Sequence, residues 1–114
     1  MKKILIAGIA LTFVFSAILW AEGGFRGYVT RYDTQATVEN AKVKWVKTGH
    51  TDSTSTNKNG YYEKYNQPDG WYNMTASKLI TDVWWTDEAY EEIDGGMTDV
   101  DFELRPGHIE KEEE

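Results

Sequence analysis

Val100-Asp101-Phe102-Glu103-Leu104 is the stretch of this sequence that decides the fold. Apolar and acidic residues alternate strictly in it, and a period of two places all the apolar side chains on one face of a β-strand. One face must therefore be core, while the other is solvated. Pro106 ends the strand, because proline cannot continue a hydrogen-bonded ladder.

The same period of two recurs along most of the chain, whereas helical periodicity is nearly absent. We expect strands over 25–31, 41–46, 51–56, 61–65, 71–78, 83–86 and 100–104. Turn residues separate them at 57–60, 68–70 and 95–96, at the spacing typical of a sandwich. The sequence therefore predicts an all-β fold, a seven-stranded antiparallel Greek-key β-sandwich.

The inward faces of these strands define the expected core. Eight side chains should line it: Val29, Val43, Trp45, Tyr72, Met74, Val100, Phe102 and Leu104. Residues 86–94 are ambiguous. Thr86 could cap a short helix that follows it, or the segment could be an irregular loop, and both alternatives stay open.

Composition excludes several classes of protein. The chain has 114 residues with 12 basic and 19 acidic side chains, a net charge of −7, and no cysteine. Disulfides and cysteine-ligated metal sites are therefore impossible. The acidic balance disfavours nucleic acid and anionic membrane surfaces as partners.

Residues 1–21 have the pattern of a bacterial secretory signal. Lys2 and Lys3 precede an apolar run that ends at Ala21, a small residue suited to the position before a cleavage site. The alternative is an uncleaved anchor, which would be the chain's only contact with a membrane. The sequence thus predicts a secreted or periplasmic protein, with a folded domain over 22–106 and an acidic, disordered tail over 107–114.

Several motifs, taken in order, resemble one known family. They are Gly27-Tyr28-Val29, Val38-Glu39-Asn40-Ala41-Lys42-Val43, Thr54-Ser55-Thr56-Asn57-Lys58-Asn59-Gly60-Tyr61-Tyr62, Pro68-Asp69-Gly70-Trp71-Tyr72 and Val100-Asp101-Phe102-Glu103-Leu104. Together they resemble the carboxypeptidase regulatory-like domains. This resemblance implies a transthyretin-like (prealbumin-type) sandwich and an accessory module without one fixed activity. Asn57, Lys64 and Gln67 depart from the family pattern, and the polar residues at 64 and 67 predict a more solvated or shifted hairpin.

Residues suited to catalysis are scarce. His50 and His108 are the only histidines, and no nucleophile motif accompanies them. We expect both to be solvated and the protein not to be an enzyme. The alternative is a hydrolase on the transthyretin-like fold, which would need His50 or His108 beside an acid.

A run of carboxylates is the one candidate metal site, and calcium would be its ion because calcium prefers oxygen ligands. Its members are Asp87, Glu88, Glu91, Glu92 and Asp94. A solvated charged face is the competing interpretation. No other cofactor is expected.

Aromatic side chains are the candidate binding residues. Trp84 and Trp85 are adjacent, so on a strand they point to opposite faces. Trp71 points away from the expected core, and Tyr28 lies opposite Val29. An exposed strip of Trp71, Trp84, Trp85 and Tyr28 could contact a protein or a carbohydrate at the cell surface, unless loops cover the rings. The sequence favours a non-catalytic exported module for binding or scaffolding at the cell envelope, with carbohydrate binding as the alternative.

Overall fold

Strands make up most of the described part of the chain. A computed structural model describes residues 23–107, and these residues contain no helix, so the predicted all-β class is confirmed. The strands are β1 (Gly24–Arg31), β2 (Lys42–Lys47), β3 (His50–Ser55), β4 (Tyr61–Lys64), β5 (Gly70–Ile80), β6 (Val83–Ile93), β7 (Met97–Asp99) and β8 (Phe102–Pro106). Short β7 is additional to the seven strands expected. The predicted signal at 1–21 and nearly all of the predicted tail at 107–114 lie outside the described residues.

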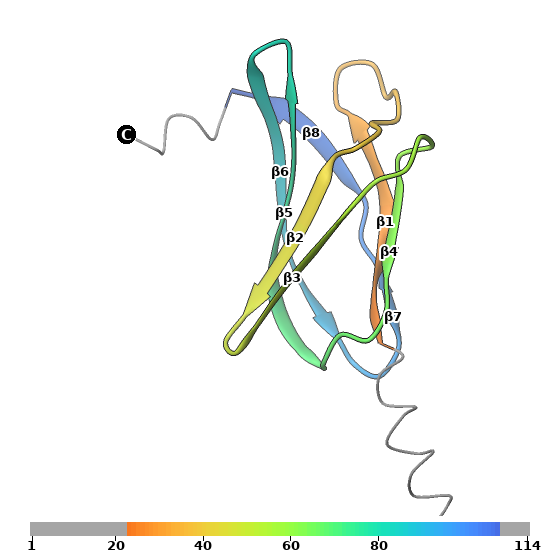
Figure 1. The fold of residues 1–114 in the computed structure, drawn as a ribbon, viewed down its shortest axis with the longest axis vertical. Coiled ribbons are helices and arrows are strands. Elements are labelled where there is room, and N and C mark those ends of the chain that lie inside the picture. Colours follow the sequence, from red (N-terminus) through yellow and green to blue (C-terminus); the bar gives the residue numbers. More distant parts are fainter. Residues whose placement is uncertain (1–22, 108–114) are drawn as a thin grey trace, which may run out of the picture.

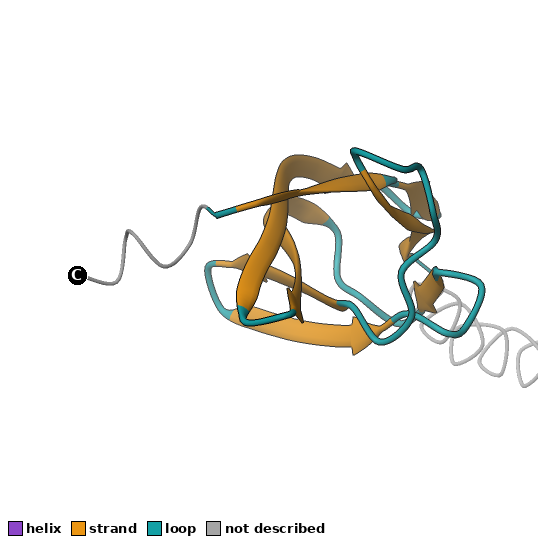
Figure 2. Cartoon of the chain, turned by 90° about the horizontal axis from the view of Figure 1, so that it is seen from above, coloured by secondary structure: helices purple, strands orange, loops and turns teal. Residues whose placement is uncertain are grey.

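The strands form two walls around one core (Figures 1 and 2). Their hydrogen-bonded order is β3-β2-β5-β6-β8-β1-β4, with β7 beside β1. The two walls are joined where Trp85 and Thr86 of β6 pair with Pro106 and Arg105 of β8. Pairing is antiparallel as expected, except that β1 also runs parallel to β8 and to β7. The order leaves β3 and β4 as the two edges of a nearly closed sheet.

The core is built from alternate side chains, as the period of two predicts. All eight expected core residues are buried. Phe25 lies at the centre, with its ring edge-on to Trp45 at 5.2 Å and to Tyr72 at 5.4 Å between centroids. Each such pair adds about 0.5–1.5 kcal/mol to the gain from burying the rings. Since the chain has no disulfide, this packing is the main source of stability.

The turn at 57–60 forms as predicted. Asn57 Oδ1 accepts hydrogen bonds from the amides of Asn59 and Tyr61. Gly60 has a φ of 76°, in the left-handed region that favours glycine. A Cβ there would lie 2.9 Å from the carbonyl oxygen of Val29, so the turn packs directly against β1.

Neither of the two alternatives for residues 86–94 is correct, because β6 continues to Ile93. β5 and β6 pair along their whole length, from Gly70 opposite Ile93 to Ile80 opposite Val83. Eleven consecutive pairs and the burial of Ile93 outweigh the capping signal at Thr86. This long ribbon of β5 and β6 determines which side chains of residues 86–94 face outward.

Among residues 23–107, no helix has the length and apolarity needed to cross a membrane.

The buried hydroxyl of Tyr62 provides a test of the core. It donates a hydrogen bond of 2.6 Å to the carbonyl of Val100, and burial raises its pKa. Tyr62→Phe leaves that carbonyl without its partner, and we expect a loss of about 1–3 kcal/mol in the free energy of unfolding, measured by urea denaturation. Exposed Tyr65→Phe is the matched control and should change it by less than about 0.5 kcal/mol. Equal effects of the two changes would contradict the placement of Tyr62.

Candidate functional site

The four predicted binding aromatics do not form one strip. Trp71, Trp84 and Tyr28 point outward, with 51%, 38% and 49% of their surfaces exposed. Trp85 is only 9% exposed, and the guanidinium of Arg31 covers its ring at 4.3 Å. Trp85 therefore belongs to the core, and its predicted place in an exposed strip is wrong. The other three lie in three separate places.

Trp71 forms a stacked pair with Tyr90. Their ring centroids lie 5.1 Å apart with 21° between the planes, and Tyr90 is 60% exposed. Tyr90 lies opposite Asn73 in the β5–β6 ladder, diagonal to Trp71, which brings the rings together. Sequence reasoning missed Tyr90 because its segment was not recognised as a strand; its alternation with Ala89 and Glu91 is the signal that could have placed it.

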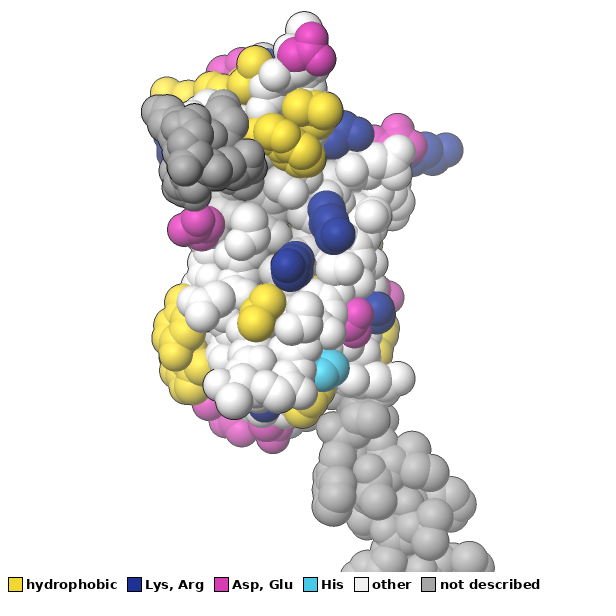
Figure 3. Space-filling model, turned by 60° about the vertical axis from the view of Figure 1, so that its left-hand side comes forward, with side chains coloured by type: hydrophobic (Ala, Val, Ile, Leu, Met, Phe, Trp, Pro, Cys, Tyr) yellow, Lys and Arg dark blue, Asp and Glu magenta, His cyan; other side chains and the backbone are white. Residues whose placement is uncertain are grey.

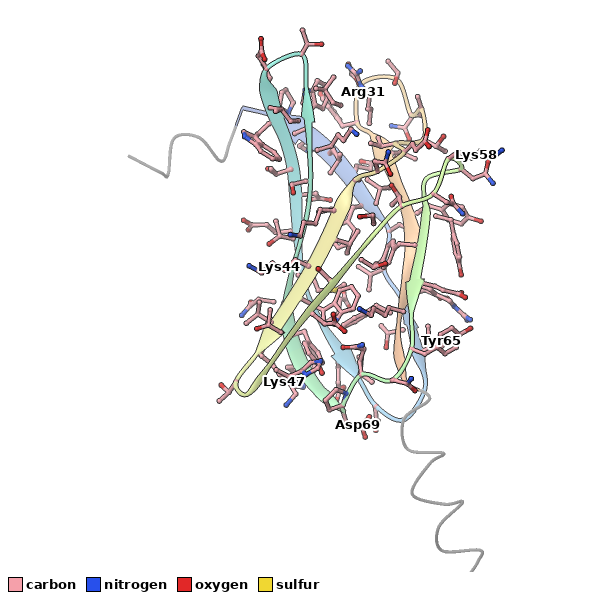
Figure 4. The ribbon with its side chains drawn as sticks, in the orientation of Figure 1. Arg31, Lys44, Lys47, Lys58, Tyr65 and Asp69 are labelled. Atoms are coloured by element: carbon pink, nitrogen blue, oxygen red, sulfur yellow. The ribbon has the colours of Figure 1, made fainter. Side chains whose placement is uncertain are left out.

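A shallow groove adjoins this pair on the outer face of β5 and β6. Its lining includes the side chains of Asn73, Thr75, Glu88 and Tyr90. Lys44 lies beside Thr75 in the β2–β5 ladder and extends outward from this wall (Figure 4). Figure 3 shows the same wall as a mostly uncharged polar surface with a few basic side chains. An aromatic pair thus stands beside hydrogen-bond donors and acceptors.

Trp84 lies at the other end of the same ribbon, opposite Leu79. Leu79 lies eight positions after Trp71 in β5, so the two residues are about 26 Å apart along the strand. The residues of this end project beyond the ladders that β5 forms with β2. They turn through Thr81 and Asp82, both with positive φ. Trp84 therefore cannot act together with Trp71 on a small ligand.

Tyr28 lies on the other wall, beside Tyr61 of β4. Their ring centroids are 5.0 Å apart, and the residues face each other in the β1–β4 ladder. The Tyr61 hydroxyl donates to Glu63 at 2.7 Å, and that bond raises the pKa of Tyr61 to about 12. A second hollow lies here, lined also by Arg26, Gly27, Asp99 and Asp101.

A buried amide, Gln67, joins the edges of the sheet. It is 2% exposed, and its Oε1 accepts hydrogen bonds from Trp45 Nε1 at 2.9 Å and from His50 Nε2 at 2.7 Å. Its Nε2 donates to Asp52 Oδ2 and to the carbonyl of Tyr65. Gln67 thus ties β2 and β3 to the segment after β4, although its departure from the family pattern had suggested a loosened hairpin.

An ion pair completes this seam between β3 and β4. Lys64 Nζ donates to Asp52 Oδ1 at 2.8 Å and to the carbonyl of Ser53. Partial burial alone would raise the pKa of Asp52, but the hydrogen bonds from Lys64, Ser53 and Gln67 outweigh it and hold that pKa below its ordinary value. The seam fixes the segment that leads into β5, where the Tyr72 hydroxyl donates to the carbonyl of Pro68 at 2.6 Å. Lys47 and Asp69 lie at this same end of the sandwich (Figure 4).

His50 is half-buried in the seam, so it is only partly solvated and not fully so as expected. Because the amide oxygen Gln67 Oε1 can only accept, the His50 nitrogen that faces it must be the donor of this hydrogen bond. Its described hydrogen bond is to this amide, not to a carboxylate or hydroxyl, so it does not form an acid–base pair. His108 lies outside the described residues.

The five carboxylates of the candidate calcium site are spread out along β6 and the loop after it. Asp87 and Glu91 point to one face of the strand, while Glu88 and Glu92 point to the other. Asp87 Oδ2 accepts the amide of Glu103, which ties it to β8. Within residues 23–107, no group of three or more metal-ligating side chains converges on one point. The structure does not bring these five carboxylates together.

Comparison with known proteins places the fold. The sequence matches no protein-family profile and no curated protein. A 5-hydroxyisourate hydrolase from Klebsiella pneumoniae shares 14% identity with a TM-score of 0.52, over 75% of this chain and 91% of its own. The fold is transthyretin-like.

Two larger proteins share this transthyretin-like sandwich. A putative carbohydrate binding protein from Bacteroides uniformis ATCC 8492 has a TM-score of 0.60 at 14% identity, over 75% of this chain and 42% of its own. A DUF3823 family protein from the same organism has a TM-score of 0.53 at 21% identity, over 75% and 43%. The chain thus spans about two fifths of either Bacteroides protein. At such identities the likeness shows the fold alone.

The change in the free energy of unfolding at low pH tests the role of the Asp52–Lys64 pair in the seam. Because the pKa of Asp52 is lower in the folded chain, its carboxylate contributes stability above the unfolded value of about 3.9, and this contribution is lost as pH falls through the folded value. Asp52→Asn should therefore be less stable than the parent at neutral pH and lose less on acidification from about pH 5 to pH 2. Denaturation midpoints at each pH measure this. Asp94→Asn, in an exposed loop, serves as control, and an Asp52→Asn curve parallel to the parent's would refute the role of the pair.

Proposed function

We propose that this protein is an exported, non-catalytic module that binds carbohydrate on the outer face of β5 and β6. The observation that carries the proposal is the exposed, stacked pair of Trp71 and Tyr90 beside the polar groove of Asn73, Thr75 and Glu88. No structural demand explains this pair, because it lies outside the core and its exposure costs apolar burial.

The chemistry of the groove suits a sugar. The C–H face of a pyranose is apolar and packs on an aromatic ring, while its hydroxyls need both donors and acceptors. Asn73 offers an amide that does both, Thr75 a hydroxyl, and Glu88 a carboxylate. The groove is shallow and lies on a flat wall, which suits an extended polysaccharide chain more than an enclosed small molecule.

Several observations support a binding role over catalysis. His50 is engaged by an amide in the seam, and it is not among the described residues that line the grooves beside the aromatics. The Bacteroides protein with the higher TM-score is a putative carbohydrate binding protein, whereas the Klebsiella protein, with the lower TM-score, is a hydrolase. A hydrolase is the less favoured alternative, since it would need an acid–base pair that His50 does not form.

Membership of the carboxypeptidase regulatory-like domains is part of the proposal. The motifs support it in their order, and the strands and turns fall where those motifs do. Two residues of these motifs support it further: the Tyr72 hydroxyl donates to the carbonyl of Pro68, and Gly60 adopts a positive φ in the turn. Lys64 and Gln67 depart from the pattern, and both make hydrogen bonds in the seam, Lys64 with Asp52 and Gln67 with Trp45.

Export and the domain boundaries also belong to the proposal. The basic start and apolar run of residues 1–21 support a secretory signal, with a domain over 22–106 and a tail over 107–114. Binding at the cell envelope follows if the signal directs export. In a bacterial host, an intact mass of the exported protein that lacks residues 1–21 is the expected result, and a cytoplasmic protein of full mass would contradict export.

A protein-docking role at the far end of the ribbon is the second candidate. Leu79, Val83 and Trp84 are exposed there, and a two-stranded ribbon projecting from a sheet is marginally stable by itself. The positive φ of Thr81 is unfavourable for a β-branched residue. In this case a partner protein would bind at this end of the ribbon, and the groove beside Trp71 would take no part in its binding.

One comparison of variants separates the two candidates. Trp71→Ala should weaken binding to neutral polysaccharides by about tenfold or more, because it removes the stacking surface. Trp84→Ala, a tryptophan of similar exposure on the same wall, should leave the affinity unchanged. Affinity electrophoresis and tryptophan fluorescence titration across a glycan panel measure both. Loss of binding with Trp84→Ala but not with Trp71→Ala would contradict the proposed site.

A further inference from the structure

The hollow beside Tyr28 and Tyr61 has features that the fold does not need. Its lining residues come from β1, β4, β7 and the segment before β8. Figure 1 shows β1, β4 and β7 across the sandwich from β5 and β6, the strands that carry Trp71 and Tyr90. The two tyrosine rings lie side by side at 55° to each other, and Tyr28 is half exposed. Their outer faces form an aromatic floor beside charged side chains.

Charged groups lie beside this floor. Arg26 Nε donates to Asp99 Oδ1 at 2.5 Å. The other N–H groups of this guanidinium make no hydrogen bond to the described residues, so they can donate to a ligand. Asp101 Oδ1 accepts the Tyr28 amide at 2.9 Å, while its Oδ2 has no partner among the described residues. The site therefore offers both donors and acceptors next to the rings.

Gly27 allows this arrangement. A Cβ on Gly27 would lie 1.9 Å from the carbonyl oxygen of Val100 and 3.0 Å from Asp101 Oδ1. The segment between β7 and β8 can approach β1 only because that Cβ is absent. This close approach places the Asp101 carboxylate within reach of the Tyr28 backbone, and so beside the aromatic floor.

We propose that this cleft is a second saccharide site and that it takes a neutral pyranose; this inference rests on the carbohydrate-binding function proposed above. The C–H face of the sugar would lie on Tyr28 and Tyr61, with neighbouring hydroxyls bonded to Arg26 and Asp101. Asp99, Asp101 and Glu63 outnumber Arg26, so an acidic or sulfated sugar would be repelled. The charge of Arg26 is already neutralised by Asp99.

Two sites on opposite walls have a functional consequence. Sheets that pack face to face lie about 10 Å apart. Because the two sites lie on the outer faces of the two walls, the distance between them is greater than this. One sugar ring cannot reach both sites, whereas two polysaccharide chains, or one that bends around the domain, can occupy them together. The protein would then cross-link glycan chains, or bind a dense glycan surface with an avidity greater than either site provides.

The two sites can be counted separately because only one contains tryptophan. Isothermal calorimetry of the full-length protein with neutral oligosaccharides should detect two sites per chain. Indole fluorescence, by contrast, should respond to the Trp71 site alone. Tyr28→Ala should remove one site from the calorimetric count and leave the fluorescence titration unchanged. Trp71→Ala should do the reverse, with the fluorescence response lost and one calorimetric site kept.

Further variants separate binding from folding. Tyr28→Phe keeps the ring and should retain the second site. Arg26→Gln removes only an exposed ion pair, so it should fold normally while weakening the second site by about tenfold. Trp84→Ala is the control and should keep both sites. Turbidity with a branched neutral polysaccharide should fall in Tyr28→Ala and in Trp71→Ala alike, since cross-linking needs both sites.

Distinct results would overturn the inference. A single calorimetric site that is lost in Trp71→Ala and unchanged in Tyr28→Ala and Arg26→Gln would exclude the second site and leave the proposed function standing. Tighter binding of an anionic polysaccharide than of a neutral one at the Tyr28 site would overturn the ligand class. No heat and no fluorescence change with any glycan would overturn the proposed function, and this site with it.

Discussion

The structure depends on one constraint: two walls of strands enclose a single layer of core, and this layer accepts only every second side chain. Val43 and Trp45 of β2 are buried, while Lys44 between them is exposed. A side chain that points outward is therefore selected for solubility or for binding, since it cannot add to the core. Trp71, Tyr90 and Tyr28 all point outward, and it is this position that makes large aromatic rings there a functional signal.

Closure of the sheet depends on polar contacts rather than on a strand ladder. β3 and β4 are the exposed edges, which would otherwise invite pairing with other chains. Gln67 and the pair of Asp52 with Lys64 occupy this seam, and Gln67 uses both its oxygen and its nitrogen in doing so. A buried amide with all its partners is stabilising, whereas the same amide with one partner missing is costly. This requirement fixes the segment that leads into Trp71.

Much of the fold could be predicted from the sequence because alternation is a local signal. It identified every strand except short β7, the eight core residues and the outward position of Trp71. The resemblance indicated the transthyretin-like topology. Alternation failed over residues 86–94, where the acidic residues and the capping signal at Thr86 hid a strand whose pairing with β5 is not local. The seam was also missed, because Gln67 and His50 meet only after the sheet closes. The single aromatic strip was wrong because strand order and length, unknown from sequence, separate its members.

Mapping of chemical shifts tests the central claim most directly, namely that the outward aromatics form the binding surface of a rigid sandwich. A neutral oligosaccharide is titrated into isotopically labelled protein, and the backbone amide shifts are followed by NMR. The account predicts changes confined to the outer faces around Trp71 and Tyr90 and around Tyr28 and Tyr61, with the core and the seam undisturbed. Shifts centred on His50 or on the ribbon end at Trp84, with none at these aromatic pairs, would contradict it.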